Sequence, residues 1–230
     1  MYLDINGLIT QQDGDGGDKL QREGFWFTGA YFNKSYPLVP GLASYSTALE
    51  ILTDANGNLE RDEILYTAVA DPNDVSRDQL IPNVIACGLY GYEDRVQRIF
   101  DNVISNFSRY TNNDVAFLTD YARFFRAFHL WFLYPLIFFL DIWLFWSSIF
   151  LVIRSYFDPN NLYVGDDLNF IADLAQTKHS YPSPFTFAAR KIFKWLRKGG
   201  PMYGMQVYFN PVTGANPEFI SLWAPIVEDF

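Results

Sequence analysis

Apolar residues recur at helical spacing along most of the chain, and strand-like alternation is scarce. Apolar positions three or four residues apart fall on one face of a helix. The pattern predicts helices over 18–33, 76–91, 92–107, 113–132, 136–157, 165–176 and 184–198, with one or two shorter helices within 37–74. One strand is predicted near the C-terminus, at 205–210. Short connections force neighbouring helices to be antiparallel, so we expect a mainly α fold of antiparallel helical hairpins in a toroid-like or bundle arrangement.

The length of 230 residues suits one large domain. We expect a single helical domain over 1–230, with an irregular N-terminal segment at 1–17 and a Gly/Pro-rich C-terminal extension at 199–230. Cys87 is the only cysteine, so no intramolecular disulfide can form. Because Cys87 lies in an apolar context, we expect it to be a small buried hydrophobic residue.

Charge and motif content exclude several kinds of site. The net charge of −9 argues against nucleic-acid binding, which needs clustered cations. The basic run at 190–200 is interpreted as a solvated helix face. Two stretches resemble calcium loops, 13–24 and 54–65, but neither has the ligand spacing of an EF-hand, and both are interpreted as turns. With no Gly-rich phosphate loop and no HExxH, the sequence predicts neither a metal nor a cofactor.

Three polar motifs fall at predicted helix starts: GDKLQREG, VSRDQL and VGDDLN. Helix capping explains part of them, because Asp18 with Gln21, and Ser76 with Gln79, have the spacing of a capping box. Capping does not account for the arginines or the extra acids. Alternate helices of consecutive hairpins are parallel, so we expect the starts at SRDQL, NDVAF and GDDLN to lie at one end of the molecule. GDKLQREG joins them if the number of intervening helices is odd, and that end would then gather carboxylates, guanidinium groups and amides.

A polar cleft of this kind suits a hydroxyl-rich ligand, and paired carboxylates could serve glycoside cleavage. The candidate catalytic acids are Asp18, Glu23, Asp78, Asp166 and Asp167. The candidate ligand-binding residues are Gln21, Arg22, Trp26, Arg77, Gln79 and Asn169. Two alternatives stay open. The Arg and Asp side chains could form buried ion pairs between helices, and Trp26 could lie in the core instead of stacking on a sugar.

The run FHLWFLYPLIFFLDIWLFWSSIFLVI, residues 128–153, has two interpretations. Its length and flanking arginines are those of a membrane span. Pro135 divides it, however, and Asp141 places an acid within the part that follows, which is costly in lipid. The favoured interpretation is two helices in the core of a globular fold, and a membrane anchor is the alternative.

The order of the motifs GDGGDKLQREGFWF, SRDQLIP and GDDLNFI resembles uncharacterised proteins of tailed bacteriophages, over about residues 4–190. The helix pattern also resembles the α/α-toroid folds of carbohydrate-active enzymes. The resemblance implies a virion or host-cytoplasm setting and a glycan as partner. Whether the protein is an enzyme stays open. A non-enzymatic virion protein that contacts other virion proteins or itself is the second hypothesis, and a membrane-associated protein is the third.

Overall fold

The computed structural model describes residues 1–10, 19–55, 57, 59, 77–105 and 217–229. It also describes separate helical positions between 142 and 157 and between 188 and 195. Of the described residues 66% are helical, so the mainly α class is confirmed. The toroid-like arrangement stays a prediction. The strand expected at 205–210 and the helices expected at 113–132 and 165–176 lie outside the described residues.

A small hairpin stands where we expected an irregular N-terminal segment. Strands β1 (Tyr2–Leu3) and β2 (Ile9–Thr10) pair antiparallel, with Tyr2 opposite Thr10. Asp4 closes the turn, because its carboxylate accepts hydrogen bonds from the backbone N–H groups of Asn6 and Leu8 at 2.8 and 2.9 Å. Two-residue strands are too short to show alternation in the sequence.

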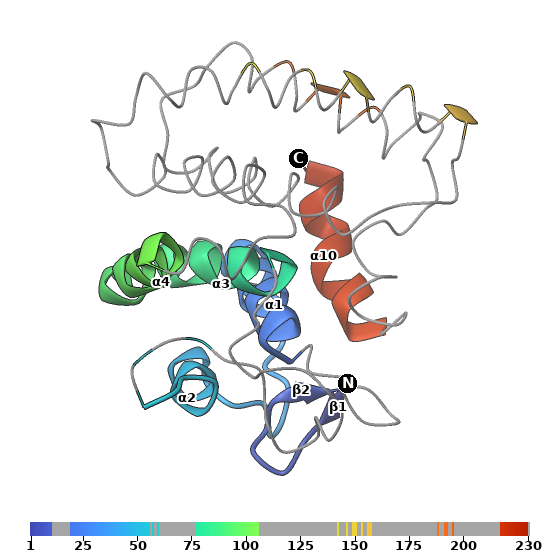
Figure 1. The fold of residues 1–230 in the computed structure, drawn as a ribbon. Coiled ribbons are helices and arrows are strands. Elements are labelled where there is room, and N and C mark those ends of the chain that lie inside the picture. Colours follow the sequence, from blue (N-terminus) through green and yellow to red (C-terminus); the bar gives the residue numbers. More distant parts are fainter. Residues whose placement is uncertain are drawn as a thin grey trace.

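Helices α1 (Lys19–Phe32) and α3 (Arg77–Tyr90) form the centre of the described fold, and they make its most extensive helix–helix contact (Figure 1). Gly24 allows the close approach. A Cβ atom at this position would lie 2.7 Å from the Pro82 side chain and from the backbone nitrogen of Asn83. The absence of a side chain on Gly24 therefore sets the distance between the two helices.

The contacts between α1 and α3 centre on Pro82 and Asn83. Near the start of α1, the Leu20 carbonyl accepts a hydrogen bond from Asn83 Nδ2 at 2.6 Å, and further along, Thr28 Oγ1 donates to the Pro82 carbonyl at 3.5 Å. Near the end of α1, the Tyr31 ring lies 5.5 Å from the Tyr90 ring. The two helices therefore cross close to Gly24 and Pro82.

Local signals end α3 and begin the next helix. Gly91 has φ +81°, and the N–H groups of Gly91 and Tyr92 donate to the carbonyls of Gly88 and Cys87, as in a Schellman motif. Helix α4 (Glu93–Ser105) follows directly, with Glu93 and Asp94 in its first turn, where the helix dipole favours acids.

Two further helices complete the described fold. Helix α2 (Tyr45–Ile51) begins after Ser44, whose side chain accepts a hydrogen bond from the Thr47 N–H as an N-cap. Helix α10 (Pro217–Asp229) lies in the segment that we expected to be a Gly/Pro-rich extension. It packs against α1, and a Cβ atom on Gly29 of α1 would lie 2.8 Å from the Leu222 and Trp223 side chains.

The long apolar run is only partly within the described residues. Residues 142, 146, 149, 150 and 153 are helical, and residues 128–141 lie outside. Among the helices that the structure describes, none is both long enough and apolar enough to cross a bilayer.

Candidate functional site

The first polar motif forms the start of α1, and its charged side chains are buried. Lys19, Gln21, Arg22 and Glu23 have exposed fractions of 0–3%. Burying charged groups is costly unless they are paired or neutralised, so each must be compensated by its surroundings. The burial of Lys19 and the burial of Glu23 are compensated in two different ways.

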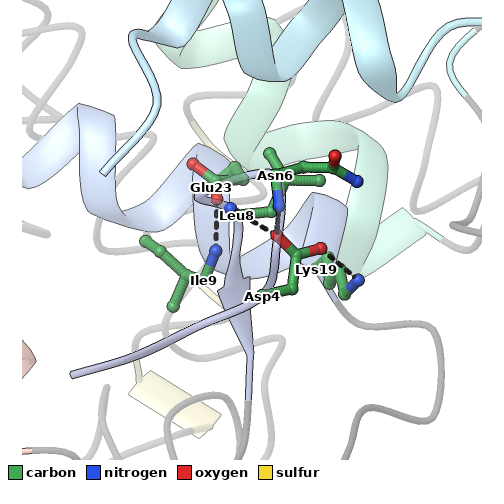
Figure 2. Close-up of polar contacts among 6 residues, drawn as sticks. All are labelled: Asp4, Asn6, Leu8, Ile9, Lys19 and Glu23. Atoms are coloured by element: carbon green, nitrogen blue, oxygen red, sulfur yellow. Dashed lines mark hydrogen bonds and ion pairs between the residues drawn. The ribbon is translucent and has the colours of Figure 1, made fainter. Parts of the chain in front are cut away.

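Lys19 is paired with Asp4 of the N-terminal hairpin (Figure 2). The distance from Lys19 Nζ to Asp4 Oδ2 is 2.6 Å, and the other carboxylate oxygen of Asp4 accepts from the turn N–H groups. Burial raises the pKa of Asp4, but the hydrogen bonds from Lys19, Leu8 and Asn6 outweigh it, and the net effect lowers the pKa. This pair joins the hairpin to α1.

Glu23 is buried completely and connects the same two elements (Figure 2). Its Oε1 atom accepts a hydrogen bond from the Ile9 N–H of β2 at 2.7 Å, whereas Oε2 has no hydrogen-bond partner within the described part of the chain. Burial raises the pKa of Glu23 to about 8, against the lowering effect of the Ile9 N–H. At neutral pH this carboxyl group is therefore mostly protonated.

The second motif starts α3. Gln79 is completely buried, and Arg77 and Asp78 lie in the first turn of the helix. That the helix starts gather at one end of the molecule stays a prediction. Asp18, together with the third motif (Asp166, Asp167 and Asn169), lies outside the described residues.

Asn83 and Tyr45 form a buried hydrogen-bond network that joins α1, α2 and α3. Asn83 Nδ2 donates to the carbonyls of Leu20 and Gln79 at 2.6 and 2.8 Å, and Asn83 Oδ1 accepts from Tyr45 Oη at 3.0 Å. Tyr45 Oη also lies 3.5 Å from Cys87 Sγ. Cys87 is buried as expected, and burial raises the pKa of its thiol to about 12, so it is not a nucleophile at neutral pH.

The members of the predicted cleft whose burial is described therefore lie in the interior: Gln21, Arg22, Glu23, Trp26 and Gln79. Gln21, Arg22, Glu23 and Gln79 line neither of the two pockets described below. Trp26 lines one of them, but only 2% of its surface is exposed. Its ring packs against Tyr36 and Phe219 at centroid distances of 5.5 and 5.1 Å, so the core interpretation of Trp26 is confirmed.

The larger pocket lies between the C-terminal half of α1, the connection to α2 and the end of α3. We call it the aromatic pocket, and its volume is about 840 Å³. Its aromatic lining residues are Trp26, Phe27, Tyr31, Tyr36, Tyr45, Tyr90 and Tyr92, and its polar lining residues include Asn33, Lys34, Ser44 and Ser46. This volume is within the range of small-molecule sites, and such sites combine apolar walls with a few polar groups.

The rings support one another in a continuous cluster. Tyr90 stands 5.5 Å from Tyr31, 5.6 Å from Tyr45 and 6.1 Å from Phe27, with mutual angles between 51° and 83°. Edge-to-face packing of this kind fixes ring orientation. The Tyr45 hydroxyl group donates a hydrogen bond to Asn83 Oδ1, whereas Tyr90 is 38% exposed at the surface. The inner side of the pocket is therefore held in place, and its outer aromatic residues are accessible.

Two of the pocket's tyrosines, Tyr36 and Tyr90, have raised pKa values. Burial raises the pKa of Tyr36, helped by Glu218, and burial raises the pKa of Tyr90, helped by Tyr92 and Tyr31. Both phenols therefore keep their protons at neutral pH. Lys34 Nζ lies 5.5 Å from the centre of the Tyr31 ring, which places a cation at the rim.

Sequence reasoning did not identify this pocket, apart from Trp26. The only available signal was the abundance of tyrosine, 15 residues in the chain, five of which line the pocket. The tyrosines come from positions 31–45 and 90–92, and no local spacing connects these two groups. The stretch GLYGY, residues 88–92, ends α3 and also supplies two aromatic lining residues, Tyr90 and Tyr92.

A second, smaller pocket of about 340 Å³ lies beside the turn at 54–57. The predicted turn is confirmed there, since the Gly57 N–H donates to the Asp54 carbonyl and Gly57 has φ +86°. Arg95 of α4 donates to Thr53 Oγ1 at 3.2 Å and holds the turn against the helix. Because acidic and basic side chains line it together, this pocket has no clear preference for the charge of a ligand.

No protein-family model, no curated protein sequence and no solved structure matches the chain. The likeness to tailed-phage proteins therefore rests on its motifs alone, and function must be argued from the geometry of the site.

Proposed function

We propose that the protein binds a glycan in the aromatic pocket. The observation that carries this proposal is the combination of five tyrosines with Asn33, Lys34, Ser44 and Ser46 around one open space of about 840 Å³. A sugar ring presents a C–H face and a rim of hydroxyl groups. Aromatic walls suit the face, and phenol, amide and hydroxyl groups at the edges suit the rim.

The proposal concerns binding and not hydrolysis. Glycoside cleavage commonly uses two carboxyl groups that flank the scissile bond. The described lining of the aromatic pocket includes no Asp or Glu, and Glu23 is enclosed behind β2 and α1. Glu23, the buried acid of α1, is better explained by its role in joining the hairpin to the helix.

The phage-type motif order supplies a setting for this binding. In a phage particle or an infected bacterium, the glycan would be a polysaccharide of the bacterial envelope. This part of the proposal rests on the resemblance, whereas the pocket rests on the described geometry, and the two can be tested separately.

The binding proposal is tested with a panel of defined oligosaccharides, using calorimetric titration of the purified chain. Tyr90→Ala removes an exposed wall of the pocket, so we expect affinity for the binding sugar to fall by about tenfold or more, or ~1.4 kcal/mol. Tyr90→Phe keeps the ring and loses only the hydroxyl, so its effect should be smaller.

Tyr2→Ala is the matched control, because Tyr2 is 49% exposed and lies in β1, outside the pocket. It should bind as the unaltered protein does. The proposal fails if no oligosaccharide of the panel binds. It also fails if Tyr90→Ala and Tyr2→Ala bind the same sugar equally well.

A further inference from the structure

The described lining of the aromatic pocket contains a single charged side chain, that of Lys34. Lys34 is exposed and follows the end of α1, and its Nζ atom lies 5.5 Å from the centre of the Tyr31 ring. The other described lining residues are apolar, aromatic, or polar without a formal charge. The charge that this pocket presents to a ligand therefore depends on Lys34.

A hydrogen-bonded turn holds the backbone of Lys34 in place. The Tyr36 N–H donates to the Asn33 carbonyl at 3.1 Å, so Lys34 and Ser35 are the two central residues of the turn. The Asn33 side chain anchors the turn, because Nδ2 donates to the Leu222 carbonyl of α10 at 2.9 Å and Oδ1 accepts from Ser35 Oγ at 2.8 Å. Only the Lys34 side chain therefore has to be ordered when a ligand binds.

No acidic side chain in the described lining offsets this cation. Burial and, to a smaller extent, the Glu218 carboxylate raise the pKa of Tyr36, so Glu218 acts on one side of the pocket. Glu218 is not one of the described lining residues, however, and it forms an ion pair with the Met1 amino group. The raised pKa values of Tyr36 and Tyr90 keep both phenols neutral, so the pocket presents a net positive charge.

We propose that the glycan of the aromatic pocket is acidic and that a sugar carboxylate pairs with Lys34, an inference that rests on the proposed function. The carboxylate of a uronic acid projects from the edge of the sugar ring, away from its C–H face. The face can lie on the aromatic walls while the carboxylate accepts hydrogen bonds from the ammonium group at the rim. Such charge-assisted hydrogen bonds are stronger than those between neutral groups.

A cationic ligand suits the pocket less well than an acidic sugar does. Aromatic rings attract cations, and aromatic cages bind quaternary ammonium groups in this way. Here Lys34 already lies near the Tyr31 ring and would repel a second cation. The net charge of −9 on the whole chain opposes an anionic ligand at long range, so a preference for the acid must come from Lys34 itself.

The test uses oligosaccharides of galacturonic, glucuronic and mannuronic acid, each compared with its methyl ester by calorimetric titration of the full chain. The ester keeps the sugar rings and their hydroxyl groups and removes only the negative charge. We expect an acid to bind about fivefold or more tightly than its ester, since a charged group strengthens the hydrogen bond. High salt should reduce this preference, because salt screens the attraction.

Variants at Lys34 assign the preference to this side chain. Lys34→Gln should bind the acid and the ester with equal affinity, whereas Lys34→Arg should keep the preference because it keeps the charge. Lys191→Gln is the matched control. Lys191 is also an exposed lysine, it is not one of the pocket-lining residues, and its replacement changes the net charge by the same amount, so this variant should keep the preference.

The outcomes separate this inference from glycan binding itself. Equal affinity of the unaltered chain for acid and ester, or binding of neutral sugars alone, overturns the acidic ligand and leaves glycan binding in place. A preference that survives in Lys34→Gln, or that is lost equally in Lys191→Gln, also overturns the role of Lys34. Binding of no oligosaccharide at all refutes the proposed function, and the acidic ligand with it.

Discussion

At the residue scale, the start of α1 shows how a folded chain accommodates buried charged groups. Lys19 is compensated by the Asp4 carboxylate, which lies 2.6 Å away. Glu23 receives one backbone hydrogen bond and has a pKa of about 8, so it is buried mostly as the neutral acid. The two residues are four positions apart on one helix. The cost of burying Lys19 is offset by an ion pair, and the cost of burying Glu23 is reduced because its carboxyl group is mostly protonated.

The raised pKa of Glu23 predicts a specific pH dependence of stability. Between the ordinary pKa of 4.5 and about 8, the folded protein keeps a proton that the unfolded chain has released. The stabilisation from this proton is complete below pH 4.5 and is lost as pH rises through about 8. The free energy of unfolding should therefore fall by on the order of 1.4 kcal/mol for each pH unit within this window.

Glu23→Gln tests this, because glutamine keeps an acceptor for the Ile9 N–H and cannot ionise. We expect urea unfolding between pH 5 and about 8 to show a flatter profile for this variant than for the unaltered chain. Glu50→Gln is the control, since the Glu50 side chain is exposed, and it should keep the original slope. Equal slopes for all three proteins would contradict the neutral, buried state of Glu23.

At the element scale, the contact between α1 and α3 depends on Gly24. Glycine within a helix normally costs about 1 kcal/mol relative to alanine. Here a methyl group would meet the Pro82 side chain and the Asn83 backbone at 2.7 Å, and backbone cannot move aside as a flexible side chain can. Close packing of the helices therefore outweighs helix propensity at this position.

Gly24→Ala should accordingly destabilise the protein by about 1–3 kcal/mol through overpacking, measured by urea unfolding. Helix propensity alone predicts that the variant is more stable than the unaltered chain by about 1 kcal/mol. A more stable variant would show that α1 and α3 do not approach as closely as the structure has them.

At the scale of the whole molecule, the two ends of the sequence meet at α1. Asn33 Nδ2 donates to the Leu222 carbonyl at 2.9 Å, and the Met1 amino group forms an ion pair with Glu218. Trp223 is 1% exposed and packs where Gly29 leaves room on α1. Helix α10 thus closes the described core from the other end of the chain.

Trp223→Ala should reduce the free energy of unfolding by about 3–5 kcal/mol, because it leaves a large cavity between α10 and α1. Ile5→Ala is the control. Its side chain is 99% exposed, so the loss should stay within about 0.5 kcal/mol. Similar losses for the two variants in urea unfolding would contradict the described position of α10.

Local sequence determined the helices whose signals are complete within a few residues. The predicted range 76–91 became α3 at Arg77–Tyr90, and 92–107 became α4 at Glu93–Ser105. Capping residues, Gly91 and apolar spacing all act between near neighbours, so they can be identified without knowing the fold.

Only the tertiary structure decided what those elements do. Helix α10 was missed because Pro225 and the surrounding Gly, Pro and Asn obscure its pattern, and its apolar face gains from burial against α1. Whether Glu23 lines a cleft or lies in the interior depends on β2, which covers it. The aromatic pocket joins residues 26–46 to 89–92. Burial and solvent access depend on which distant segments meet, and no short stretch of sequence contains that information.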